Sequence, residues 1–276
     1  MIRDITIGQY YPADSVIHKL DPRVKLFATL IYIIALFAYK GILGLVLITL
    51  FMAACIKASK VPFSFMIRGL KAIFILLMIT ALFNLFLTPG TDGATTYWSW
   101  GVLQITDTGI ANAVTMALRL VYLILGTSLM TLTTTPNQLT DALETSMAPL
   151  NKVHVPVHAI AMMMSIALRF IPILIEETDK IMKAQMARGA DFENGNIIQK
   201  AKNMVPLLVP LFVSAFRRAD DLAMAMEARC YNGGEGRTKM KPLKYTGTDR
   251  MAYVLVIAFL IVVIALRFVP LHIGIF

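Results

Sequence analysis

The sequence predicts an all-α integral membrane protein with about five transmembrane helices plus a cytoplasmic or interfacial domain of long amphipathic helices. Hydrophobic residues make up 57% of the 276 positions and charged residues 16%, with a mean hydropathy of +0.69. Soluble domains carry about 25% charged residues, so this composition excludes a soluble enzyme, a disordered chain and a collagen-like fibre. The apolar residues gather in long runs, and the segments that join these runs alternate between rich and poor in lysine and arginine.

Five apolar runs account for the predicted spans, since about 20 mostly apolar residues cross the hydrocarbon core of a bilayer. They are Leu26–Tyr39, Ile42–Ile56, Leu70–Leu87, Ile110–Leu132 and Met251–Val269. Only Lys40 and Gly41 separate the first two runs, which predicts a tight transmembrane hairpin. We therefore expect three regions, which are 1–134 with four transmembrane helices, 135–248 as a cytoplasmic domain, and 249–276 as a C-terminal transmembrane helix.

The distribution of basic residues predicts the orientation, because cytoplasmic segments are enriched in lysine and arginine. Four basic residues precede the first run, the stretch 89–109 has none, and fifteen lie between Thr135 and Arg250. This alternation places the N-terminus and the 135–250 region in the cytoplasm of a multi-pass protein of the plasma membrane. The net charge of +9 reflects this asymmetry and contact with anionic lipid of the bilayer, so we expect no nucleic-acid partner.

The external stretch 89–109 combines glycine and threonine turn residues with Tyr97, Trp98 and Trp100. Aromatic rings at such a position are typical of the belt at a membrane surface. A ligand-stacking role for these rings stays open as an alternative.

Two further apolar stretches lie within the predicted cytoplasmic region. Val155–Ile175 is long enough to span, although a histidine and an arginine interrupt it, and Val205–Phe216 gives only about 18 Å of helix. If both crossed the bilayer, the basic residues between them would lie outside, against the charge rule. We therefore expect two helices that lie along or under the membrane and pack on each other, with Arg217 and Asp221 able to form a pair four residues apart.

Both of these long helices are expected to end at an arginine. The first ending reads Met186–Ala187–Arg188–Gly189, and the second reads Met226–Glu227–Ala228–Arg229–Cys230–Tyr231. One arginine in a last helical turn is an ordinary capping charge, favoured by the helix dipole. Two such endings, 41 positions apart, indicate more, because an exposed guanidinium offers five donors in a rigid fork that suits a partner's carboxylate.

With these endings the chain resembles the transmembrane T component of energy-coupling factor (ECF) transporters, whose hallmark is a pair of Ala-Arg-Gly motifs that close cytoplasmic coupling helices. Ala187–Arg188–Gly189 matches the motif fully, whereas Ala228–Arg229–Cys230 carries cysteine in place of glycine, which puts the local turn in doubt. The segment Ile17–Leu26, IHKLDPRVKL, also resembles the opening of the family. The resemblance covers essentially the whole chain and favours the branch shared among several vitamin transporters.

The resemblance implies a division of labour among subunits. Two ABC-type ATPase subunits would hold ATP and Mg and drive transport, and a small membrane-embedded S component would bind the substrate. This chain would join them as a scaffold, without being an enzyme and without binding a cofactor, and its two arginines would insert into grooves of the ATPases. The expected docking residues are Ala187, Arg188, Gly189, Glu227, Ala228, Arg229 and Cys230.

The apolar faces of the coupling helices would hold one S component or several that exchange. The chain has seventeen methionines, whose flexible side chains give a surface suited to repacking against different partners. The expected contact residues are Met162, Met163, Met164, Met182 and Met224. Plain filling of a membrane-protein core by methionine stays open as an alternative.

Motifs for other chemistry are missing from the sequence. Gly233–Thr238 lacks the spacing and the lysine of a phosphate-binding loop. The four histidines are scattered, and Cys55 and Cys230 offer neither a metal spacing nor a disulfide framework, so we expect no bound metal and propose no catalytic set. Arg119 lies within a membrane run, where charge is costly, and is a candidate for either a functional or a structural contact.

Three other readings of the sequence stay open. A T component of a dedicated cobalt or nickel ECF importer would share the arginine motifs but serve one metal-specific S component. A self-contained secondary transporter would be expected to show internal repeats with charged or broken segments at mid-membrane. A membrane-embedded enzyme would bring His, Asp, Glu or Cys residues together near one membrane face.

Overall fold

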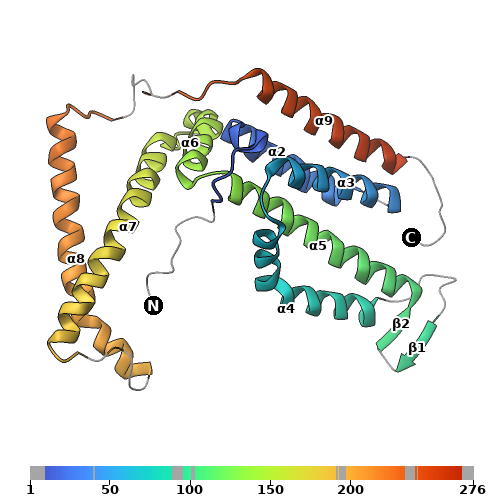
Figure 1. The fold of residues 1–276 in the computed structure, drawn as a ribbon, viewed down its shortest axis with the longest axis horizontal. Helices are drawn as coiled ribbons and strands as arrows, with labels where there is room; N and C mark the ends of the chain where they lie inside the picture. The colour runs from blue at the N-terminus through green and yellow to red at the C-terminus, as the bar shows by residue number, and fades with distance from the viewer. Residues whose placement is uncertain are drawn as a thin grey trace. The chain divides into compact units, whose positions relative to one another are not determined.

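In the computed structural model, helices dominate the residues that the structure describes, which are 10–39, 41–88, 96–100, 103–190, 192, 197–233, 240 and 242–268 (Figure 1). The elements are α1 (Val16–Lys19), α2 (Pro22–Ala38), α3 (Gly41–Ser59), α4 (Phe63–Leu87), β1 (Thr96–Trp100), β2 (Leu103–Thr106), α5 (Asp107–Thr133), α6 (Pro136–Met147), the 3-10 helix η1 (Ala148–Val153), α7 (Val157–Ala187), α8 (Ile197–Ala228) and α9 (Gly247–Phe268). The all-α membrane fold expected from the sequence is confirmed.

Within the described residues, four helices, α3, α5, α7 and α9, are long and apolar enough to cross a membrane. A fifth span is formed if the two limbs of α4, Phe63–Lys71 and Ile73–Phe86, count together across their 63° bend (Figure 1). The first predicted run corresponds to α2, whose 17 residues give about 25 Å of helix. The run that the sequence places beside the membrane lies in α7, and the 31 residues of this helix are also sufficient to cross, so its placement stays a prediction.

The stretch that the sequence predicts to be external contains a β-hairpin, which the sequence did not predict. Strands β1 and β2 pair antiparallel, with Trp98 opposite Ile105 and Trp100 opposite Leu103. Aromatic and β-branched residues favour strands because their side chains fit a pleated surface. Thr106 ends the hairpin and caps α5, since its hydroxyl oxygen accepts the N–H of Gly109 over 3.0 Å. The role of the tryptophans at the membrane surface stays a prediction.

The described residues fall into two compact units, which are treated separately below. One unit holds those of 140–242, including α7 and α8, and we call it the helix-pair unit. The other holds those of 8–139 and 243–276, including α1 to α5 and α9, and we call it the core unit. The three-region division expected from the sequence stays a prediction.

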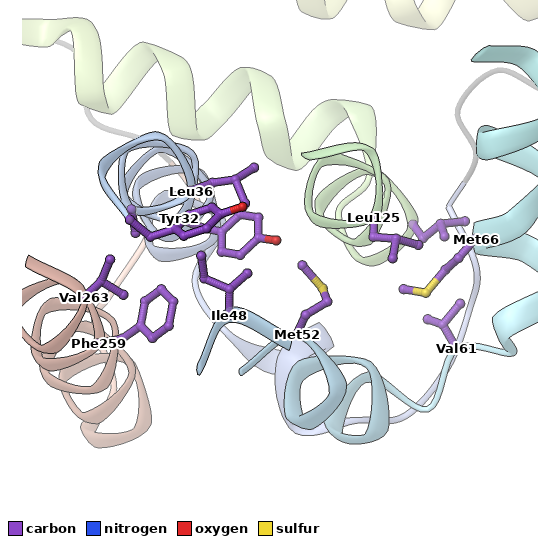
Figure 2. Packing of buried hydrophobic residues seen from close by; sticks show 12 residues of the cluster. Tyr32, Leu36, Ile48, Met52, Val61, Met66, Leu125, Phe259 and Val263 are labelled. Atoms are coloured by element: carbon purple, nitrogen blue, oxygen red, sulfur yellow. The ribbon is translucent and has the colours of Figure 1, made fainter. Parts of the chain in front are cut away.

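The core unit packs around one apolar cluster contributed by α2, α3, α5 and α9 and by the start of α4 (Figure 2). Phe51 of α3 stacks on Phe259 of α9 with ring centroids 4.1 Å apart. Helix α5 approaches α2 closely at Gly126, where an added Cβ would lie 2.4 Å from the ring of Tyr32, so the position requires glycine. Further members of the cluster are Leu36, Ile48, Met52, Val61, Met66, Leu125 and Val263.

The family-like opening, residues 17–26, forms a buried polar network. The Asp21 carboxylate caps α2 by accepting the N–H of Arg23 over 2.9 Å, and it also pairs with the Arg23 guanidinium over 2.8 Å. The N–H of Asp21 donates to Asp249 over 2.8 Å, and the other oxygen of Asp249 accepts the N–H and the hydroxyl of Thr246, each over 2.7 Å. The network therefore joins the start of α2 to the start of α9.

Lys25 extends this network to the end of α5. Its ammonium donates to the carbonyl of Thr133 over 2.7 Å and to that of His18 over 3.1 Å. Lys25 is only 5% exposed, so these two bonds offset the cost of burying its charge. The orientation rule counts Arg23 and Lys25 as surface charges. Both side chains are in fact buried and belong to this structural network.

Candidate partner-docking site

Helix α7 ends in a hydrogen-bonded turn built around Gly189. The N–H of Ala190 reaches back to the carbonyl of Gln185 over 3.0 Å, and the N–H of Gly189 donates to the carbonyl of Met186 over the same distance. Gly189 has φ +90°, in the left-handed region that glycine enters without steric cost. The turn satisfies carbonyls that a helix end leaves without partners, and it stops the helix at Arg188.

Helix α8 ends in the same way. The N–H of Tyr231 reaches back to the carbonyl of Met226 over 3.0 Å, and the N–H of Cys230 donates to the carbonyl of Glu227 over 2.8 Å. Cys230 has φ +56°, so it occupies the left-handed position that Gly189 holds at the end of α7. The departure from glycine therefore leaves the turn intact, and Arg229 follows the last residue of its helix as Arg188 does.

The side chains at both endings are open to a partner. All seven predicted docking residues are exposed. Neither Arg188 nor Arg229 belongs to any ion pair of the residues that the structure describes. Each guanidinium can therefore direct its five donors at a group outside the chain. Their role in docking stays a prediction.

One carboxylate of α7 contacts two side chains of α8 where the helices cross. Glu177 of α7 accepts the hydroxyl of Ser214 over 2.6 Å and pairs with Arg218 over 2.7 Å, and both of these partners belong to α8. The packing of the two helices on each other, expected from the sequence, is confirmed. Arg217 and Asp221, which the sequence makes able to pair, are not among the ion pairs of the described residues, and the arginine of α8 that pairs across to α7 is Arg218.

A second contact between the helices arises from the prolines of α8. Pro210 has no N–H, so the carbonyl of Pro206, four residues earlier, lacks its helical donor. The side-chain amide of Gln185 in α7 donates to this carbonyl over 3.3 Å. Gln185 lies in the last turn of α7, so the contact fixes the end of α7 against the first third of α8.

The two endings lie far apart in the helix-pair unit. Glu177 in the middle of α7 contacts Ser214, whereas Gln185 near the end of α7 contacts Pro206, which lies earlier in α8. The two helices therefore run antiparallel (Figure 1). Arg188 is thus close to the level of Pro206, whereas Arg229 lies roughly 34 Å further along α8. A single groove cannot take both arginines, and the arrangement offers two separate docking points.

The methionines expected to contact an S component do not form a single patch. Met163 and Met164, near the start of α7, are 59% and 42% exposed, and Met224 of α8 is 61% exposed. Met162 and Met182 are half-buried. Met182 lies about 27 Å along α7 from Met164, so any one small partner would meet only part of the set.

Two other candidate groups have contacts within the chain. Arg119 lies over the rings of Tyr39 and Phe37, at 5.1 Å and 5.6 Å from their centroids, which stabilises its charge by cation–π contact. His158 pairs with Glu144 over 2.9 Å. No three His, Cys, Asp or Glu side chains in the described ranges lie close enough together to hold a metal ion.

Comparison with known proteins identifies similar chains. The family described as "Cobalt transport protein" (CbiQ) matches residues 13–240. The energy-coupling factor transporter transmembrane protein EcfT of Clostridium kluyveri is 59% identical over 252 residues, which cover 91% of this chain and 93% of that protein. The EcfT proteins of Ruminiclostridium cellulolyticum and Bacillus subtilis are 52% and 47% identical, over 98% and 97% of this chain and 99% and 98% of their own lengths.

Proposed function

The chain belongs to the CbiQ family of cobalt transport proteins, and from this premise we propose that it is the coupling subunit of an ECF-type ABC importer for vitamins or other micronutrients. It is a multi-pass membrane protein similar over nearly its full length to transmembrane proteins of ECF transporters. In this role two partner ATPases would bind and hydrolyse ATP with Mg, and a membrane-embedded S component would carry the substrate. The N-terminus and the helix-pair unit would face the cytoplasm.

The observation that carries this proposal is the pair of matching helix ends. Each ending places an exposed arginine directly after a long helix, with no carboxylate partner among the described residues. A guanidinium that enters a partner's groove can form two parallel bonds to one carboxylate, and such charge-assisted bonds are strong. Two endings about 34 Å apart suit two ATPase subunits, one for each arginine.

The helix pair would transmit movement because the contacts of Glu177 and Gln185 with α8 hold the two helices together. When the ATPases close, the arginine-anchored ends would have to follow them. Glu177, with its bonds to Ser214 and Arg218, lies between the two anchored ends and links one helix to the other. The S component, docked on exposed apolar surface of the two helices, would then reorient and release its substrate to the cytoplasm.

Affinity purification from native membranes in mild detergent tests the proposal. The wild-type chain is expected to bring down two ATPase-sized subunits and one or more small membrane proteins. Reversal of either charge, Arg188→Glu or Arg229→Glu, is expected to lower the recovered ATPase by about tenfold or more, because a carboxylate would then face a carboxylate. Arg217→Glu is the matched control, since Arg217 is exposed on α8 away from its end. A chain that purifies alone and transports in liposomes would contradict the proposal in favour of a self-contained carrier.

A second candidate is a dedicated cobalt or nickel importer, which the description of the matching family favours. The identity of the co-purified small proteins separates the two candidates. Uptake of cobalt or nickel with a single S component would support the second candidate, and uptake of vitamins with several S components would support the first.

A further inference from the structure

The core unit contains a cavity of about 180 Å³ that the coupling role does not use. Its walls come from α1, α2, α3, α5 and α9. The lining is largely apolar, and Tyr32 and Met52 of Figure 2 belong to it. Apolar cavities of about 150 Å³ stay dry and bind small hydrocarbons, so this cavity favours an apolar occupant over water.

The position of the cavity indicates that lipid tails are the apolar molecules next to it. Three of the helices that form its walls, α3, α5 and α9, are long and apolar enough to span a bilayer. Leu255, which lines the cavity, is 50% exposed, so the wall on the side of α9 borders the surface of the unit. In a membrane that surface is covered by lipid tails, which are flexible, narrow and present at very high local concentration.

One end of the cavity carries a buried cation. Lys25 and Thr133 both line the cavity, and the ammonium of Lys25 donates to the Thr133 carbonyl. An ammonium has three donors, and the two backbone carbonyls take two of them. The nearby carboxylates are otherwise engaged, since Asp21 pairs with Arg23, and Asp249 accepts from backbone N–H groups and a threonine hydroxyl. The remaining N–H of Lys25 therefore suits an anionic oxygen of a ligand.

We propose that this cavity binds one acyl chain of an anionic lipid, with the anionic group of the lipid accepting from Lys25. The carboxylate of a fatty acid and the phosphate of a phospholipid share this chemistry. A lipid bound there would fill space between α2, α3, α5 and α9, so it would stabilise the packing of the core unit. This inference does not depend on the coupling role.

The test uses the full-length chain, with the partners that co-purify with it, in vesicles of phosphatidylcholine. One vesicle preparation contains phosphatidylglycerol with a diazirine in one acyl chain, a second contains palmitate with a mid-chain diazirine, and a third contains phosphatidylcholine with the diazirine chain. After illumination, mass spectrometry maps the labelled peptides. At least one anionic probe is expected to label the α3 segment around Cys55 and the α9 segment around Leu255 several-fold more than the phosphatidylcholine probe does. Whichever of the two labels more strongly identifies the source of the anionic group.

Ala28 of α2 and Ala252 of α9 both line the cavity, and Ala258 of α9 is exposed. Filling the cavity with Ala252→Phe, or more gently with Ala28→Leu, is expected to lower this labelling by about tenfold. Ala258→Phe adds the same ring to the same helix outside the cavity and should leave the labelling unchanged.

Labelling spread evenly over the lipid-facing helices, or unchanged in both filled variants, would overturn the proposal. Equal labelling by the anionic and zwitterionic probes would overturn the part assigned to Lys25. An absence of labelling in the assembled complex, with labelling of the isolated chain, would overturn it in favour of a partner side chain in the cavity.

Discussion

The ends of α7 and α8 differ in sequence but share one geometry. The first closes on Gly189 at φ +90° and the second on Cys230 at φ +56°, and both form the same pair of backward hydrogen bonds. A Cβ in the left-handed region costs roughly 1–2 kcal/mol, and the second ending tolerates this cost. The turn that stops each helix before its arginine is therefore maintained at both ends, although only the first ending has glycine at the left-handed position.

The largest expected effect tests whether the two ends are equivalent in function. Arg188→Glu and Arg229→Glu should each lower substrate uptake by about tenfold or more, and the double variant should lower it little further, because residues that act as one unit are not additive. Uptake of a radiolabelled substrate into vesicles measures this effect. Two independent losses that multiply in the double variant would show that the ends act separately.

The next effect concerns the contact that links the two ends. Glu177→Ala removes the acceptor of Ser214 and Arg218, so uptake should fall several-fold while the ATPases still co-purify. ATP hydrolysis and uptake are measured on the same vesicles, and the amount of substrate taken up per ATP hydrolysed should fall. Glu176→Ala is the control, since Glu176 is exposed and next in sequence. If both variants transport like the wild type, the crossing does not transmit movement.

A smaller effect uses the cysteine as a reporter of occupancy at the second end. Cys230 is exposed and Cys55 is half-buried, so a charged maleimide should label Cys230 in the free chain. Docking of an ATPase over Arg229 should slow this labelling about tenfold or more, because the neighbouring groove would shield the thiol. Mass spectrometry of the labelled chain gives the rate. Equal rates with and without bound ATPase would place the docking surface elsewhere.

The smallest effect exchanges the turn residues themselves. Gly189→Ala should lower the free energy of unfolding of the helix pair by about 1 kcal/mol, because a Cβ then enters the left-handed region. No atom lies within 4 Å of the position for that Cβ, so strain in the backbone is the only new cost. Cys230→Gly should raise the free energy of unfolding by a similar amount. Thermal unfolding in detergent measures both, and shifts of the same sign would contradict the comparison.

Much of the site could be read from the sequence because its geometry is local. Each ending is completed within six residues, and the apolar runs fix the helices that precede it. The hairpin of β1 and β2 was not predicted because two strands of four or five residues give only a brief alternation of side chains. The glycine and threonine residues nearby are typical of a loop and favoured that interpretation. The proline pair of α8 was a usable signal, since Pro210 leaves the carbonyl of Pro206 in need of a donor.

The sequence by itself determined the membrane class, the helices and the two arginine endings, because hydropathy, helical periodicity and the closing turn depend on neighbours in the chain. Only the tertiary structure decided which distant groups meet. Glu177 selects Arg218 over Arg217, and Asp21 bonds to Asp249 across 228 positions. Each helix carries several charged side chains that could form such a contact. Which of them does so depends on how the helices are rotated and how closely they pack. For the same reason Lys25, counted from the sequence as one more basic residue, lies in the wall of a cavity.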